Sequence, residues 1–219
     1  LDVIKNLIST ANEQSVYLAF ELLDSSLEAW HFSSSHSFDF GANPRDFGYR
    51  PKTNQDVADW YQLFIEYTSE FITNKTPHSE RAKKVLGKSL RSLWRQNHLR
   101  NLIESTCIKI STLGMWADGF SAIHDILKWD CKTSTEKEKQ RLQSIANQLS
   151  PKSLLDDINM YVLADKWKFH DLDEYDENGI LIEHGYKKGQ QYAIDLGVKV
   201  ANTDSQLLQS MLTELLSYS

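Results

Sequence analysis

The chain has 219 residues, of which 41% are hydrophobic and 11% aromatic, so it can bury the core of one large or two small domains. Its formal charge of -6 argues against a general nucleic-acid or anionic-membrane surface, because such a surface needs an excess of Lys and Arg. No apolar run reaches the roughly 20 residues that span a bilayer. We therefore expect a cytoplasmic protein without a membrane partner.

The start of the chain and its two cysteines indicate what kind of protein it comes from. The chain starts at Leu1 and Asp2, which fit neither a signal peptide nor a translation start, so we expect a fragment of a longer protein. Cys107 and Cys131 lack the spacing of a metal or redox motif, and two reduced thiols are the expectation for a cytosolic chain. A catalytic role for either cysteine would need a partner histidine, which the sequence does not reveal.

Apolar side chains recur at i, i+3 and i+4 along most of the chain, and only four prolines interrupt them, which predicts an all-α protein. The first two helices are expected at 2–10 and, with Asn12 as its cap, at 12–30. Thr53 should cap the third, with Asp56 completing a capping box. Thr76, followed by Pro77, should cap the fourth.

The second half continues in the same way. Further helices are expected at 97–112 and 116–129, and a Ser/Thr cap near Thr135 should start the next one. Ser150 and Pro151 should open an eighth helix, an acidic break follows at 170–179, and the last two helices are expected at 182–201 and 205–216. The prediction is an irregular α-solenoid or an orthogonal bundle of about ten helices. We expect one domain over 1–219, with a candidate sub-boundary near 165–180.

One segment departs from the helical pattern. Residues 38–53 combine two prolines and two glycines, which exclude a continuous helix, with aromatic and arginine side chains that favour packing. We therefore expect an ordered structural or recognition loop, because a long structureless loop is uncommon in a compact domain. Its candidate contact residues are Phe40, Arg45, Phe47, Tyr49 and Arg50.

A basic stretch after position 80 is the best candidate for a nucleic-acid surface. It contains Lys83, Lys84, Arg91 and Arg95, most of which lie off the apolar stripe of their helix. Helical periodicity alone requires a solvated polar side there, so an ordinary exposed face is the simpler interpretation.

Four tryptophans also occupy apolar helix positions, and we expect them mainly in the core rather than in a ligand platform. They are Trp60, Trp94, Trp116 and Trp129.

No motif for catalysis, cofactor binding or metal binding is evident. The acidic run after Asp171 lacks the oxygen spacing and bend glycine of a calcium loop, and His31, His36 and His170 lack the further ligands that zinc requires. No phosphate-binding glycine loop and no nucleophile elbow occurs. We therefore expect no catalytic, cofactor or metal residue in this segment and no enzymatic activity, although a hydrolase site without a sequence signature is a third alternative.

The segments at 40–53, Trp60-Tyr61, Leu90-Arg-Ser-Leu-Trp94, Gly114-x-Trp116-x-x-Gly119, Leu127-x-Trp129-Asp130 and Leu149-Ser-Pro151 carry a resemblance. Together they resemble the helical-repeat region of large bacterial STAND-type NTPases and anti-phage defence proteins, over roughly positions 38–165. The resemblance implies that an effector and a nucleotide-binding domain precede a long helical array, and it places no catalytic residue here.

The leading hypothesis is a non-enzymatic helical-repeat segment for protein recognition or intramolecular regulation, whose partners are other domains of the same polypeptide or a protein ligand. The alternative is a nucleic-acid-binding helical domain that uses Lys83, Lys84, Arg91 and Arg95.

Overall fold

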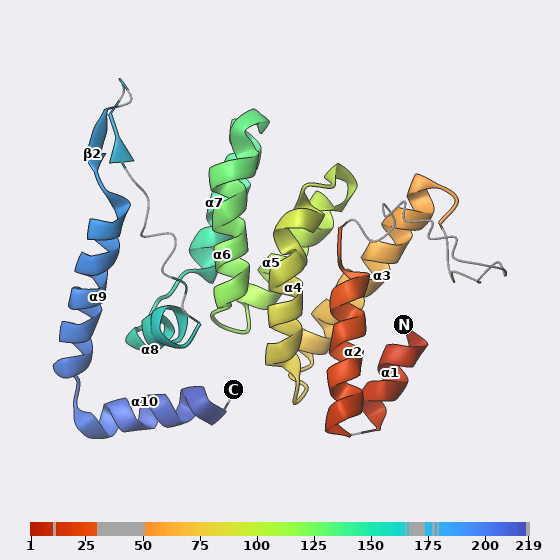
Figure 1. The fold of residues 1–219 in the computed structure, drawn as a ribbon, viewed down its shortest axis with the longest axis horizontal. Coiled ribbons are helices and arrows are strands. Elements are labelled where there is room, and N and C mark those ends of the chain that lie inside the picture. Colours follow the sequence, from red (N-terminus) through yellow and green to blue (C-terminus); the bar gives the residue numbers. More distant parts are fainter. Residues whose placement is uncertain are drawn as a thin grey trace, which may run out of the picture. The chain divides into compact units, whose positions relative to one another are not determined.

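A computed structural model describes residues 1–10, 12–29, 51–164, 166, 174–176, 178 and 180–217. The fold is all-α, as predicted: ten α-helices account for most of the described chain (Figure 1). The chain divides into two compact units, Leu1–Leu113 and Gly114–Ser219. The expected sub-boundary near 165–180 therefore lies inside the second unit. The candidate residues of the aromatic loop, Phe40, Arg45, Phe47, Tyr49 and Arg50, lie outside the described residues.

In its described residues the first unit has five helices and a short 3-10 turn. They are α1 (Asp2–Ser9), α2 (Glu13–Ser26), α3 (Asn54–Thr73), α4 (Ser79–Trp94), η1 (Asn97–Leu99) and α5 (Arg100–Ser111). Helix α1 packs on α2, α2 packs on α4, and α3 packs on both α4 and α5. The apolar stripes predicted from the sequence meet in one core, which includes Phe20, Leu23, Tyr61, Ile65, Leu86, Leu90, Trp94, Ile103 and Ile110.

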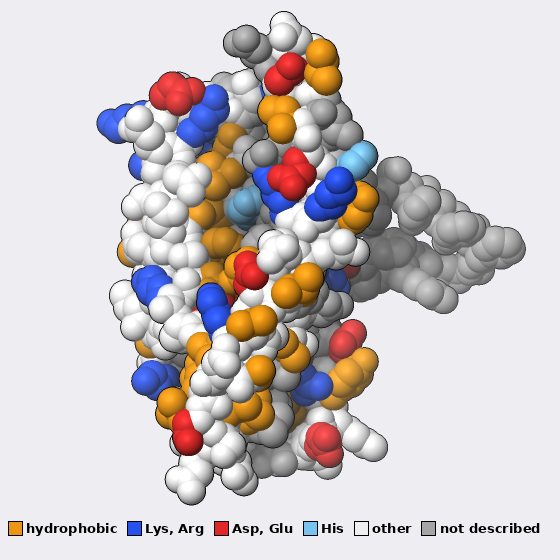
Figure 2. All heavy atoms as spheres, turned by 90° about the vertical axis from the view of Figure 1, so that its left-hand side faces the viewer, with side chains coloured by type: hydrophobic (Ala, Val, Ile, Leu, Met, Phe, Trp, Pro, Cys, Tyr) orange, Lys and Arg blue, Asp and Glu red, His pale blue; other side chains and the backbone are white. Residues whose placement is uncertain are grey.

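The second unit contains the remaining helices and one short strand pair. They are α6 (Ala117–Asp125), the π-helical turn η2 (Ile126–Asp130), η3 (Cys131–Thr133), α7 (Glu136–Leu149), α8 (Leu154–Asp157), the π-helical turn η4 (Ile158–Leu163), β1 (Glu174–Tyr175), β2 (Leu181–Glu183), α9 (Gly185–Ala201) and α10 (Ser205–Ser217). The two strands are antiparallel. Strand β1 lies inside the predicted acidic break at 170–179, whereas β2 overlaps the start of the helix expected at 182–201, which begins at Gly185 instead. Figure 2 shows hydrophobic side chains at the surface of this unit.

Three of the five predicted helix caps are confirmed. Asn12 accepts from the first turn of α2, and Thr53 and Thr135 form complete capping boxes. The caps predicted at Thr76 and Ser150 are wrong.

Both hydroxyls close the preceding helix instead. Thr76 donates to the Phe71 carbonyl at 3.3 Å, and Ser150 donates to the Asn147 carbonyl at 2.9 Å. Helix α4 consequently begins at Ser79, and Ser153 caps α8.

Side chains of α3 and of Gln96, just after α4, bond backbone carbonyls at the end of α2 and in the residues that follow it. The indole and phenol donors of Trp60 and Tyr61 bond the carbonyls of Ser26 and Glu28 at 2.9 and 2.7 Å. The Gln96 amide bonds the next carbonyl, that of Ala29, at 3.0 Å. The Trp60 bond replaces the intrahelical partner that the Ser26 carbonyl lacks at the helix end, and the three bonds together fix the end of α2 and the residues after it against α3 and the end of α4.

The motif Gly114-x-Trp116-x-x-Gly119 acquires a structural explanation. Gly114 has a φ of +117°, a conformation that side chains rarely tolerate, at the start of the second unit. Trp116 is 2% exposed, and its ring lies directly against the backbone of Gly119. The two glycines therefore serve a turn and a close approach, which are both packing roles.

Of the four tryptophans, Trp129 is not a core residue. Trp94 and Trp116 are buried and Trp60 is half-buried, but Trp129 is 51% exposed. It lies in η2, where the Cys131 amide bonds back to the Ile126 carbonyl, a wider spacing than in an α-helix. The extra residue in the turn changes the side-chain direction that α-helical periodicity predicts.

Candidate functional site

Five basic side chains form a row along α4. They occupy i, i+3 and i+4 spacings and so share one side of the helix. They are Arg81, Lys84, Lys88, Arg91 and Arg95. Three of the four predicted patch residues, Lys84, Arg91 and Arg95, belong to this row.

The fourth predicted residue, Lys83, lies on another side of α4. Its side chain is only 13% exposed, and its ammonium is 2.6 Å from a carboxylate oxygen of Glu80 one turn earlier. Lys83 therefore contributes to the local pairing of α4 rather than to its basic row.

Helix α2 presents an acidic row to α4. Glu21, Asp24 and Glu28 follow one another at spacings of three and four residues, the last just after the helix. The Lys88 ammonium donates to Asp24 Oδ2. This bond and the charge of Asp24, followed by those of Glu28 and Glu21, raise the pKa of Lys88. The two rows thus attract each other across the helix pair.

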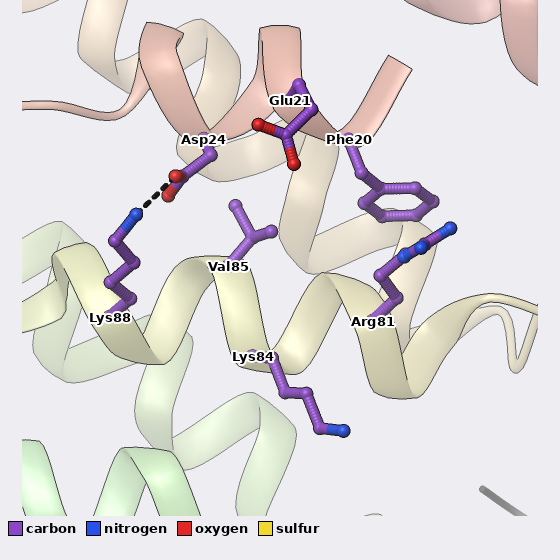
Figure 3. Close-up of a pocket in the computed structure, with 7 residues that line it drawn as sticks. All are labelled: Phe20, Glu21, Asp24, Arg81, Lys84, Val85 and Lys88. Atoms are coloured by element: carbon purple, nitrogen blue, oxygen red, sulfur yellow. Dashed lines mark hydrogen bonds and ion pairs between the residues drawn. The ribbon is translucent and has the colours of Figure 1, made fainter. Parts of the chain in front are cut away.

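An open groove lies between these rows (Figure 3). Phe20 and Val85 supply its apolar surface, and Arg81 holds its guanidinium 5.4 Å from the centre of the Phe20 ring. Tyr17 extends this contact, with its ring centre 5.6 Å from the same guanidinium. Figure 3 shows Lys88 directed at Asp24, while Lys84 is directed away from α2.

The dimensions of the groove suit a side chain better than a metabolite. Its volume is about 170 Å³, and it is open to solvent along the helices. Sites for small ligands usually enclose about 300 to 1,000 Å³ and bury most of the ligand. A protein partner needs only a shallow apolar depression flanked by charges, which is what Phe20, Val85 and the two rows provide.

The acidic half of this site was not foreseen from the sequence. Nothing in the sequence marks Glu21 or Asp24 as neighbours of α4. The i, i+3, i+4 spacing of the α4 bases was a usable signal, and it would have replaced Lys83 by Lys88. Among the described residues, no group of three or more His, Cys, Asp or Glu side chains could hold a metal ion.

The comparisons with known proteins add no relative. No protein-family model, curated protein or solved structure matches this chain. Within the described helices, none combines the length and apolar character needed to cross a membrane.

Proposed function

We propose that this chain is a non-enzymatic helical-repeat segment for protein recognition or intramolecular regulation, and that the groove between α2 and α4 is its contact surface. The partner is another domain of the same polypeptide or a separate protein. The resemblance at 38–165 suggests a large bacterial STAND-type NTPase of the anti-phage defence kind as the parent protein. In that setting the segment acts in the cytoplasm and needs no cofactor of its own.

One observation carries this proposal: an acidic and a basic row flank an apolar floor on the outside of two packed helices. The half-buried Val85, beside the buried ring of Phe20, can receive an apolar side chain of the partner. Lys84 and Glu21 are exposed on the two sides and can orient it through charges of opposite sign. Such rim charges contribute mainly to specificity and association rate.

The charge arrangement favours a protein over a nucleic acid. Asp24 engages Lys88, and Glu21 and Glu28 lie close enough to raise the pKa of that lysine. A phosphate backbone approaching the α4 row would meet these carboxylates as well. The alternative, nucleic-acid binding, draws support from the unbroken row that contains Lys84, Arg91 and Arg95.

Site-directed photocrosslinking in the full-length polypeptide tests the proposal. Glu21→p-benzoylphenylalanine places the crosslinker at the groove, and Leu63→p-benzoylphenylalanine, at an exposed position of α3, is the matched control. We expect a discrete crosslinked product from position 21 only, reduced by Lys84→Glu. Equal products from both positions, or none from position 21, would contradict the proposed contact surface.

Fluorescence anisotropy tests the alternative, nucleic-acid binding. A labelled DNA duplex and a labelled single-stranded RNA should bind more weakly than about 100 μM at physiological salt, the weak end of non-specific affinity. Binding tighter than about 1 μM would favour the alternative if it weakens steeply with salt and is lost in Arg95→Glu.

A further inference from the structure

Helix α9 has one apolar face that is already used inside the second unit. Gly189 and Leu196 are buried, and Tyr192 and Val200 pack against the cluster formed by Ala117, Met160, Tyr161 and Leu196.

Polar contacts fix the same face. The Tyr192 hydroxyl donates to Asp157 Oδ1 at 2.8 Å, and the Lys199 ammonium is 3.8 Å from the other oxygen of that carboxylate. Helix α9 is therefore held in one rotation within its unit.

A second stripe runs along α9 beside this buried face, and its members are exposed and uncharged. Its members follow one another at i, i+4, i+7, i+8, i+11, i+12 and i+15, so they line one side of the helix for about 22 Å. They are Tyr186, Gln190, Ala193, Ile194, Gly197, Val198 and Ala201. The three largest apolar members, Tyr186, Ile194 and Val198, are 53%, 59% and 53% exposed. We call this set the outer stripe of α9.

Gly197 has no packing role within the described structure. A Cβ atom added to it would meet nothing within 4 Å, whereas glycine in a helix interior lowers helix stability. Residues without a side chain allow another helix to approach closely. The glycine in the outer stripe therefore points to a helix that packs against this face.

The order of large and small side chains in the outer stripe is self-complementary. Along the chain, Ala193, Ile194, Gly197 and Val198 alternate small and large. When a second α9 runs antiparallel about a two-fold axis that crosses the outer stripe at the level of positions 195 and 196, residue numbers that face each other add up to 391. Ile194 then faces Gly197 of the second copy, and Ala193 faces Val198 of the second copy, so each bulky side chain meets a small one.

The charges at the ends of the stripe agree with the same register. Lys187 is exposed on the same side of α9 as the outer stripe, and in the antiparallel pair it lies near the level of Asp204 of the second copy, three residues after the end of α9. The Asp204 carboxylate also accepts from the backbone N–H groups of Gln206 and Leu207. Because of the two-fold axis, this attraction between Lys187 and Asp204 occurs twice in the dimer. The opposed helix dipoles of an antiparallel pair add to it.

We propose that the outer stripe of α9 binds a second copy of this chain in an antiparallel, two-fold symmetric helix pair. This dimer is independent of the recognition groove, and its failure would leave the proposed function unchanged. A single helix pair buries less than the roughly 1,600 Å² of a standard stable interface, so the dimer should dissociate on dilution.

Sedimentation equilibrium on the whole chain tests the pairing. From about 5 to 500 μM, a range chosen to span a weak association, the weight-average mass should rise from 25.3 kDa toward twice that value. Ile194→Lys should weaken the association at least tenfold, while Val162→Lys, equally exposed on η4 of the same unit, should not. Thermal melting confirms that both variants fold. A monomer throughout, or equal effects of the two variants, overturns the proposal.

Disulfide trapping tests the antiparallel register. The native thiols Cys107 and Cys131 are buried, so introduced surface cysteines should react selectively. A mixture of Ile194→Cys and Gly197→Cys chains should form the mixed disulfide several times faster than either chain links to itself. Faster self-linking of either chain would refute the antiparallel pair.

Discussion

Gly119→Ala should destabilise the second unit because the added methyl group would overlap the Trp116 ring. The new Cβ atom would lie 2.2 Å from Cε3, 2.4 Å from Cδ2 and 2.7 Å from Cζ3 of that ring. Trp116 is 2% exposed, so the ring has no solvent space into which it can move. Overpacking of this kind costs up to about 3 kcal/mol, and the better helix propensity of alanine returns about 1 kcal/mol. The net loss should be about 2 kcal/mol.

Urea unfolding, followed by circular dichroism and tryptophan fluorescence, measures this loss of unfolding free energy. In thermal unfolding the melting temperature should fall by about 4 to 8 °C. Gly197→Ala is the matched control, because its methyl group would meet nothing within 4 Å. At low micromolar concentration it should raise the free energy of unfolding by about 0.5 to 1 kcal/mol. If Gly119→Ala stays within about 0.5 kcal/mol of the parent, the packing argument fails.

Three further changes test other parts of the fold. Lys75 has a φ of 50°, so Lys75→Gly should raise the free energy of unfolding by about 0.5 to 1 kcal/mol in urea titrations, and a loss would contradict the strain. Tyr61→Phe leaves the Glu28 carbonyl without its 2.7 Å bond, and unfolding should become about 1 kcal/mol easier, whereas no change would mean that water replaces the phenol. Burial, followed by the bond to Asp157, raises the pKa of Tyr192 to about 12. The raised pKa of Tyr192 therefore contributes fully to stability below pH 10, and this contribution is lost as the pH rises toward 12. The Tyr192→Phe variant should lose less unfolding free energy at alkaline pH than the parent. An unchanged pH profile would assign the loss to another group.

The helices were predictable because each one carries its own signal. The apolar stripe of α4 runs through Leu86 and Leu90, and both are fully buried. Thr53 and Asp56 lie three residues apart, which is all that a capping box requires. Such features depend on neighbours within a turn or two, and a single sequence contains them completely.

The errors arose where two local solutions compete. Thr76 and Ser150 each directly precede a proline, a sequence that is typical of a helix start. In the structure each hydroxyl instead donates to a carbonyl of the preceding helix. At Trp129 the competing solution is the wider turn of η2. An α-helical wheel assigns that tryptophan to the core, whereas one additional residue in the turn exposes it to solvent.

The groove between α2 and α4 depends on a relation between two helices that periodicity does not encode. Asp24 and Lys88 lie 64 residues apart, and their pairing requires a particular rotation and axial position of α2 against α4. Core packing sets both: Phe20 and Leu23 on α2 and Leu86 on α4 are buried. Once these stripes pack together, the charged positions beside them are brought close to each other. The groove is therefore a consequence of the core, and substitutions that reverse a charge at its rim should alter binding while the underlying helix pair stays folded.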